Sequence, residues 1–143
     1  MTLLEEIRRL YEEYFAEFQQ LEQNRRLGAG AFGLSGGPRD YPCHQRFAGD
    51  LERLLQRAEN IPSDEAAHIL DYIWFAPQAR EDRQDAVYWM LTAVHGMTAE
   101  LAGRLSSPRA AQLLDRYQRA YPRREQLPVQ KKVAAVLKKR AKA

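Results

Sequence analysis

The sequence predicts a single-domain all-α protein, an irregular bundle of about six helices around a central apolar helix at about residues 82–105. Three observations predict this class. Apolar residues recur at helical spacing, no segment shows the alternation of a strand, and proline or glycine breaks separate segments of helical length. At 143 residues, the chain is long enough to bury a core without disulfides or metals.

The first helix is predicted over about residues 3–24. Thr2 and Glu5 have the spacing of a capping box, and apolar residues then recur every three or four positions as far as Leu21. A glycine-rich loop is predicted at 25–40. Its segment from Gly28 to Gly33 matches the G-x-G-x-x-G spacing of phosphate-binding loops, but a long helix precedes it where such loops follow a strand. We therefore interpret it as a connector.

The remaining helices are bounded by proline and by capping residues. We expect helices at about 41–59, with Asp40 as the cap, and at about 64–75, ended by Pro77. Ser107 and Pro108 are expected to open the next helix, which Pro122 ends. Pro128 then opens a basic C-terminal helix at 128–143.

The segment from Ala86 to Ala99 carries no charge, which predicts that the central helix is buried on nearly all sides. Gly96 is a candidate break or kink within it. Several aromatic residues gather around the preceding turn, and we expect them in the core. The alternative is that one or two of them are exposed and anchor a partner. This aromatic group comprises Tyr72, Trp74, Phe75, Tyr88 and Trp89.

No residue pattern predicts a catalytic, cofactor-binding or metal site. Cys43 and His44 are adjacent, and His68 and His95 lie on later helices, but none has the ligand spacing of a zinc site. A cysteine at a helix N-terminus can be reactive without being catalytic. We expect His95 in the core with its ring hydrogen-bonded. No nucleophile or oxyanion donors accompany the pair His68 and Asp71, so we do not interpret it as a site.

Charge is divided unevenly along the chain. Residues 1–103 hold 10 basic and 17 acidic side chains, whereas residues 104–143 hold 12 basic and 2 acidic ones. All five lysines lie between Lys131 and Lys142. Such a division predicts an acidic partner for the C-terminal part or a dipolar arrangement between surfaces. The alternative is a solvated basic tail.

Basic residues of the last two helices are the candidate partner-binding residues. Arg109, Arg116, Arg119 and Arg123 have the spacing of one helix face, and arginines in such a strip bind phosphates or carboxylates. The predicted set is Arg109, Arg116, Arg119, Arg123, Arg124, Lys131, Lys132, Lys138, Lys139 and Arg140.

The sequence thus favours a non-enzymatic binding protein of adaptor or inhibitor type, with an acidic protein or nucleoprotein complex as partner. A small phage or mobile-element protein would have this size and charge. Direct DNA or RNA binding of low sequence specificity is the first alternative, and an enzyme of unknown class is the second. The basic helix lacks Trp and Phe, which argues against a membrane partner. A single cysteine and no signal-peptide pattern favour the cytoplasm. The oligomeric state stays open.

Overall fold

The computed structural model describes residues 1–27 and 37–143, and this part of the chain folds into helices without any strand. The helices are α1 Leu3–Arg26, α2 Pro42–Gln56, α3 Ser63–Phe75, α4 Asp85–Ala93, α5 Ala99–Ala102, α6 Ser107–Ala120 and α7 Pro128–Ala141. Short 3-10 turns are η1 Pro38–Asp40, η2 Pro77–Ala79, η3 Val94–Thr98 and η4 Arg123–Glu125. The all-α prediction is confirmed. The G-x-G-x-x-G segment lies outside the described residues.

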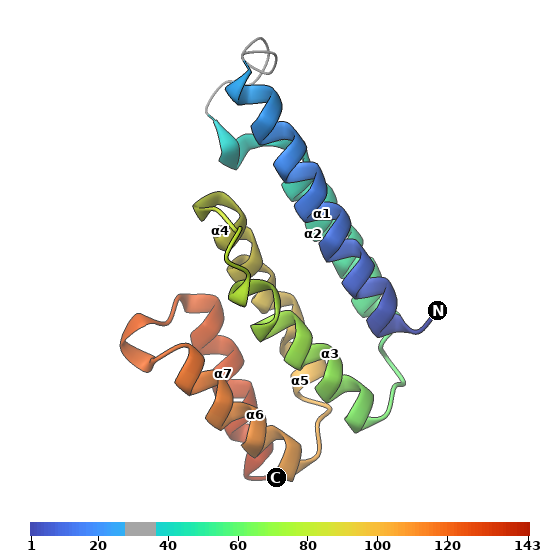
Figure 1. The fold of residues 1–143 in the computed structure, drawn as a ribbon. Coiled ribbons are helices and arrows are strands. Elements are labelled where there is room, and N and C mark those ends of the chain that lie inside the picture. Colours follow the sequence, from blue (N-terminus) through green and yellow to red (C-terminus); the bar gives the residue numbers. More distant parts are fainter. Residues whose placement is uncertain (28–36) are drawn as a thin grey trace.

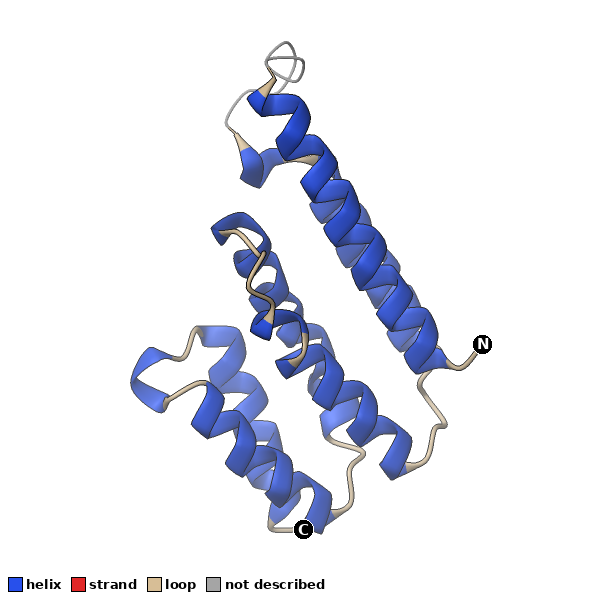
Figure 2. Cartoon of the chain, viewed as in Figure 1, coloured by secondary structure: helices blue, strands red, loops and turns tan. Residues whose placement is uncertain are grey.

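The helices form three layers, each made of consecutive segments of the chain (Figure 1). α1 packs on α2 in the first layer, and α6 packs on α7 in the last. α3 and the run α4–η3–α5 lie between them, and α3 contacts both α1 and α6 (Figures 1 and 2). Among the described helices, none has the length and apolar character that a bilayer-spanning segment needs.

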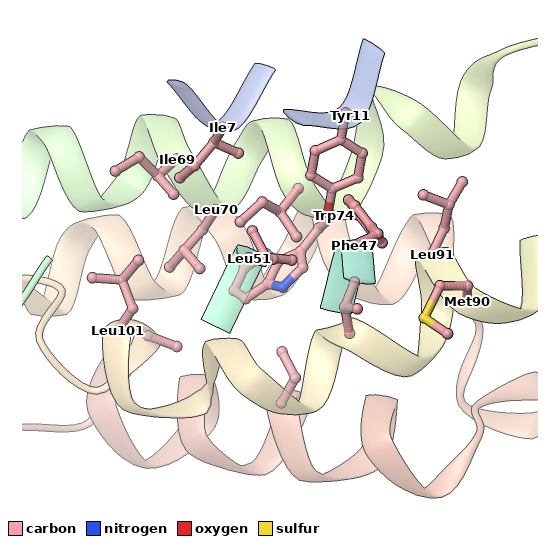
Figure 3. Packing of buried hydrophobic residues seen from close by; sticks show 14 of the residues in the cluster. Ile7, Tyr11, Phe47, Leu51, Ile69, Leu70, Trp74, Met90, Leu91 and Leu101 are labelled. Carbon is pink, nitrogen blue, oxygen red and sulfur yellow. The ribbon is translucent and has the colours of Figure 1, made fainter. Parts of the chain in front are cut away.

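Trp74 of α3 is the largest fully buried side chain and joins the middle layer to the last one. Its indole N–H donates to Thr98 Oγ1 at 2.9 Å, and its ring meets the Tyr117 ring of α6 edge-on at 5.0 Å. Figure 3 shows Trp74 among the core side chains, with Leu70 of the same helix and Leu51 of α2 nearby. The core is therefore centred on α3.

The apolar helix predicted at about 82–105 is divided into three shorter elements. The chain instead runs through α4, the 3-10 turn η3 and the four-residue helix α5. Two local causes explain the break. Gly96 is a poor helix former, and the Thr98 hydroxyl donates to the His95 carbonyl at 2.6 Å, competing with the backbone for this acceptor. The predicted break at Gly96 is confirmed, but the segment resumes only as one turn of helix.

Burial along α4 also differs from the prediction. Leu91 and Val94 are buried as their apolar run predicts. Tyr88 and Trp89, however, keep 37% and 43% of their surface exposed, so α4 has one side on solvent. An uncharged run does not reveal which of its sides lacks a neighbour. Of the five predicted core aromatics, only Trp74 is fully buried.

Most helix boundaries follow the predicted signals. The Thr2 hydroxyl accepts from the Glu5 amide at 3.1 Å, and the Glu5 carboxylate accepts from the Thr2 amide at 3.4 Å, which completes the capping box of α1. Two caps shift by a residue. Ser106 replaces Ser107 as the cap of α6, and Tyr41 replaces Asp40 ahead of α2, because Asp40 belongs to η1.

Candidate partner-binding surface

The helix α6 presents its apolar side to the middle layer. Ser106 caps the helix, and its amide donates to Ser63 Oγ at the start of α3 at 2.8 Å. Ala110, Leu113 and Tyr117 are buried, as their spacing predicts. These contacts fix the side of α6 on which the arginines lie.

Two of the predicted partner-binding arginines instead bind α3. The Arg109 guanidinium pairs with Asp64 at 2.9 Å, and Arg116 pairs with Asp71 while its guanidinium carbon lies 4.2 Å from the centre of the Phe75 ring. Helical spacing does not predict these pairs, because the acidic partners lie 45 positions upstream in the chain. The Asp71 carboxylate therefore pairs with Arg116 of α6 rather than with His68 on its own helix.

We expect the loss of one of these pairs to have a small effect on stability. In Asp71→Asn, the free energy of unfolding should fall by less than about 1 kcal/mol, because both side chains of the pair remain partly exposed to solvent. Urea unfolding checks this value, with Asp115→Asn on the outer side of α6 as the matched control. A loss of about 3 kcal/mol would mean that the Arg116–Asp71 pair is a major support of the last layer.

The turn between α6 and α7 is held by side-chain caps. Gln126 Nε2 donates to the Tyr121 carbonyl at 3.0 Å, and Gln130 Oε1 accepts from the Leu127 amide at 2.8 Å. The Tyr121 hydroxyl donates to the backbone carbonyl of Trp74, which ties the turn to the middle layer. Pro128 opens α7 as predicted. The turn thus holds η4 and the start of α7 in a defined position.

α7 places its lysines on the side opposite its buried side. Val133 and Leu137 are fully buried, and helical spacing directs the lysines away from them. At a rise of about 1.5 Å per residue, the stretch from Lys131 to Lys139 spans about 12 Å. We define the basic hairpin surface as the exposed cations of the turn and of α7, namely Arg123, Arg124, Lys131, Lys132, Lys138 and Lys139.

None of these six cations forms an ion pair with a carboxylate in the described part of the chain. The four other predicted residues have partners inside the protein. Besides Arg109 and Arg116, Arg119 pairs with Asp115 one turn away, and Arg140 donates from Nε to the Leu105 carbonyl. The structure thus divides the predicted set into six available cations and four engaged ones.

The acidic residues of the first layer are mostly paired with arginines. Glu6 pairs with Arg57 at 2.8 Å, and the Arg57 guanidinium lowers the pKa of that carboxyl. Arg80 reaches both Glu12 at 2.9 Å and Asp82 at 2.8 Å. Most carboxylates of the first layer therefore have an arginine partner, whereas the cations of the basic hairpin surface have no carboxylate partner among the described residues.

Cys43 and His44 lie inside the first layer, away from solvent. Burial raises the pKa of the Cys43 thiol to about 11, which disfavours the reactive thiolate at neutral pH. His44 Nδ1 lies 2.6 Å from the Tyr14 hydroxyl, and His44 Nε2 lies 2.7 Å from the Pro38 carbonyl oxygen. Since a carbonyl only accepts, Nε2 carries a proton and donates it to the Pro38 carbonyl. Both ring nitrogens are thus engaged in the fold.

His95 occupies the core, as predicted, with both ring nitrogens in hydrogen bonds. Nδ1 lies 2.9 Å from the Tyr117 hydroxyl and Nε2 lies 2.8 Å from Gln78 Nε2. Burial lowers the pKa of His95 to about 3, so the ring is neutral near pH 7. Within residues 1–27 and 37–143, no group of three or more His, Cys, Asp or Glu side chains is placed to hold a metal ion.

Comparisons with protein-family models, with curated proteins and with solved structures give no match for this chain. The most distinctive feature of the candidate site is the basic hairpin surface.

Proposed function

We propose that this chain is a non-enzymatic binding protein, of adaptor or inhibitor type, whose basic hairpin surface docks on an acidic surface of a partner protein. The observation that carries the proposal is the set of six exposed cations without ion-pair partners on the last layer. Charge of one sign on one face steers association with a surface of the opposite sign.

The supporting frame of this surface favours a preformed docking site. Trp74 and Tyr121 anchor the hairpin to the middle layer, and the buried side of α7 fixes the direction of its lysines. A partner then meets cations whose backbone positions are already set, which lowers the entropy that binding must overcome.

Direct binding of DNA or RNA is the second candidate function. Four lysines on one side of α7 span a distance over which several phosphates of a duplex can be contacted. Such contacts would provide affinity without sequence specificity. Ion pairs inside the protein reduce the charge available for this role, because Arg109, Arg116 and Arg119 are already paired with aspartates.

Charge reversal on α7 tests the proposal. We expect Lys132→Glu combined with Lys139→Glu to weaken binding of a fluorescein-labelled, glutamate-rich peptide at least about tenfold, which corresponds to about 1.4 kcal/mol. The reason is that each change replaces an attractive contact by a repulsive one. Fluorescence anisotropy measures the dissociation constant, and thermal unfolding should be nearly unchanged, because both lysines are exposed.

The matched control reverses two exposed arginines of the first layer, Arg8→Glu with Arg26→Glu, and changes the net charge equally. Equal losses in the two variants would show that only overall charge matters and would overturn the proposed surface. A short duplex DNA is titrated in parallel over a salt series. Tighter binding of the DNA than of the peptide at about 150 mM salt would favour the nucleic-acid function instead.

A further inference from the structure

A groove that the sequence does not predict lies beside the basic hairpin surface, where α3, η2 and α4 meet the end of α6. Its volume is about 480 Å³, within the range of about 300–1,000 Å³ that is usual for binding pockets. Three aromatic side chains from separate segments line it, namely Phe75, Tyr88 and Tyr121. Tyr88 is one of the few large apolar side chains that the fold leaves exposed.

Two arginines lie over the aromatic rings of this groove. The Arg83 guanidinium carbon is 4.7 Å from the centre of the Tyr88 ring, and that of Arg116 is 4.2 Å from the centre of the Phe75 ring. Asp71 also lines the groove and pairs with Arg116. Arg83 has no such partner among the carboxylates of residues 1–27 and 37–143. The lining thus combines apolar surface with net positive charge.

The groove also contains side chains with unused hydrogen-bonding capacity. Gln78 is only 8% exposed, and its amide nitrogen donates to the Leu91 carbonyl at 3.3 Å. Its buried Oε1 atom and the buried Nε atom of Arg83 have no hydrogen-bond partner in the described part of the protein. One is an acceptor and the other a donor, which is the complement of the N–H and C=O groups of a peptide.

We propose that this groove receives a bulky apolar side chain, flanked by acidic residues, from a peptide segment of the partner protein. The inference rests on the proposed function and adds an anchor to it. Charge complementarity argues for this occupant: Arg83 lines the groove, and the exposed Arg123 and Arg124 follow its lining residue Tyr121 after one intervening proline. A large aromatic side chain that fills a pocket inside a polar rim is a usual anchor of a protein interface.

A pair of peptides and a pair of variants test this assignment. The probe is a fluorescein-labelled peptide with one tryptophan flanked on both sides by glutamates, and its control has alanine in place of tryptophan. We expect the tryptophan peptide to bind the wild-type protein at least about tenfold more tightly. Ala120→Trp fills the groove and should abolish this difference. Ala111→Trp makes the same exchange at an exposed position of α6 outside the groove and should preserve it.

Tyr88→Ala provides a second test, because it removes one wall of the groove at an exposed position and leaves the core intact. It should reduce the preference for tryptophan by several fold. Equal affinities of the two peptides, with binding still lost on reversing Lys132 and Lys139, would overturn the anchor and leave the proposed function standing. If that reversal also leaves peptide binding unchanged, the proposed function fails as well. If the protein binds neither peptide but does bind an oligonucleotide, and Ala120→Trp blocks that binding, the groove is a nucleic-acid site and the peptide proposal is overturned.

Discussion

Trp74→Ala should lower the free energy of unfolding by about 3–5 kcal/mol, the range for truncation of a large buried aromatic side chain. The indole is fully buried, contacts Tyr117 edge-on and donates to Thr98. Its removal opens a cavity at the junction between the middle and last layers and leaves the Thr98 hydroxyl without its donor. Since small domains are stable by about 5–15 kcal/mol, this loss brings the protein close to unfolding.

The chain offers a matched control in its second tryptophan. Trp89 is 43% exposed on α4, so Trp89→Ala should lower the free energy of unfolding clearly less than Trp74→Ala does. Urea unfolding followed by far-ultraviolet circular dichroism measures both variants without relying on indole fluorescence. Equal losses at the two positions would contradict the placement of Trp74 at the centre of the bundle.

Acid should destabilise the protein through His95. The pKa of this buried imidazole is lowered from 6.5 to about 3 by burial, so the folded protein resists protonation that the unfolded chain accepts. Stability is therefore fully present above pH 6.5 and falls as the pH drops from 6.5 towards 3. The loss amounts to about 1.4 kcal/mol per pH unit in this window, and it levels off below the folded-state pKa.

The contribution of His95 is separated from that of other titrating groups by comparing how steeply the free energy of unfolding changes with pH in two proteins. Unfolding free energies of the wild type and of His95→Gln are measured from about pH 6.5 to pH 5, above the range in which most carboxylates titrate. In His95→Gln, the free energy of unfolding should fall less steeply with decreasing pH than in the wild type. This holds whatever the stability of the variant at neutral pH. Gln112→Ala changes an exposed residue that does not titrate and should retain the wild-type slope. An unchanged slope in His95→Gln would contradict the neutral, buried state of this ring.

Local signals in the sequence account for most of the fold. The capping pair Thr2 and Glu5, and prolines such as Pro128, determine helix ends through contacts within three or four residues, so they can be read from the chain directly. The buried sides of α6 and α7 follow from helical spacing for the same reason. The number of residues over which the helix is interrupted after α4 was harder to predict. It depends on a hydrogen bond from the Thr98 hydroxyl to the His95 carbonyl.

The candidate site was less predictable, because availability of a charge depends on distant partners. Spacing alone placed Arg109, Arg116 and Arg123 on one face, yet the first two bind α3 and Arg123 lies in the turn η4. The aromatic groove was missed because its walls come from three separate segments. The signal that the sequence does contain is its aromatic group, for which exposure of one or two members is the alternative to burial, and Tyr88 is such an exposed member.

The construction of each layer from consecutive segments has a consequence for biosynthesis. A growing chain can complete the first two layers before α6 and α7 have been made, since neither layer needs a later strand or helix to pair with inside itself. At about 5–20 residues per second, the last layer follows the middle one by about 2–7 s. During that interval, the side of the Trp74 ring that later contacts Tyr117 is not yet buried by α6. Nascent chains stalled near Leu105 are therefore the species in which we expect aggregation or chaperone binding to be greatest.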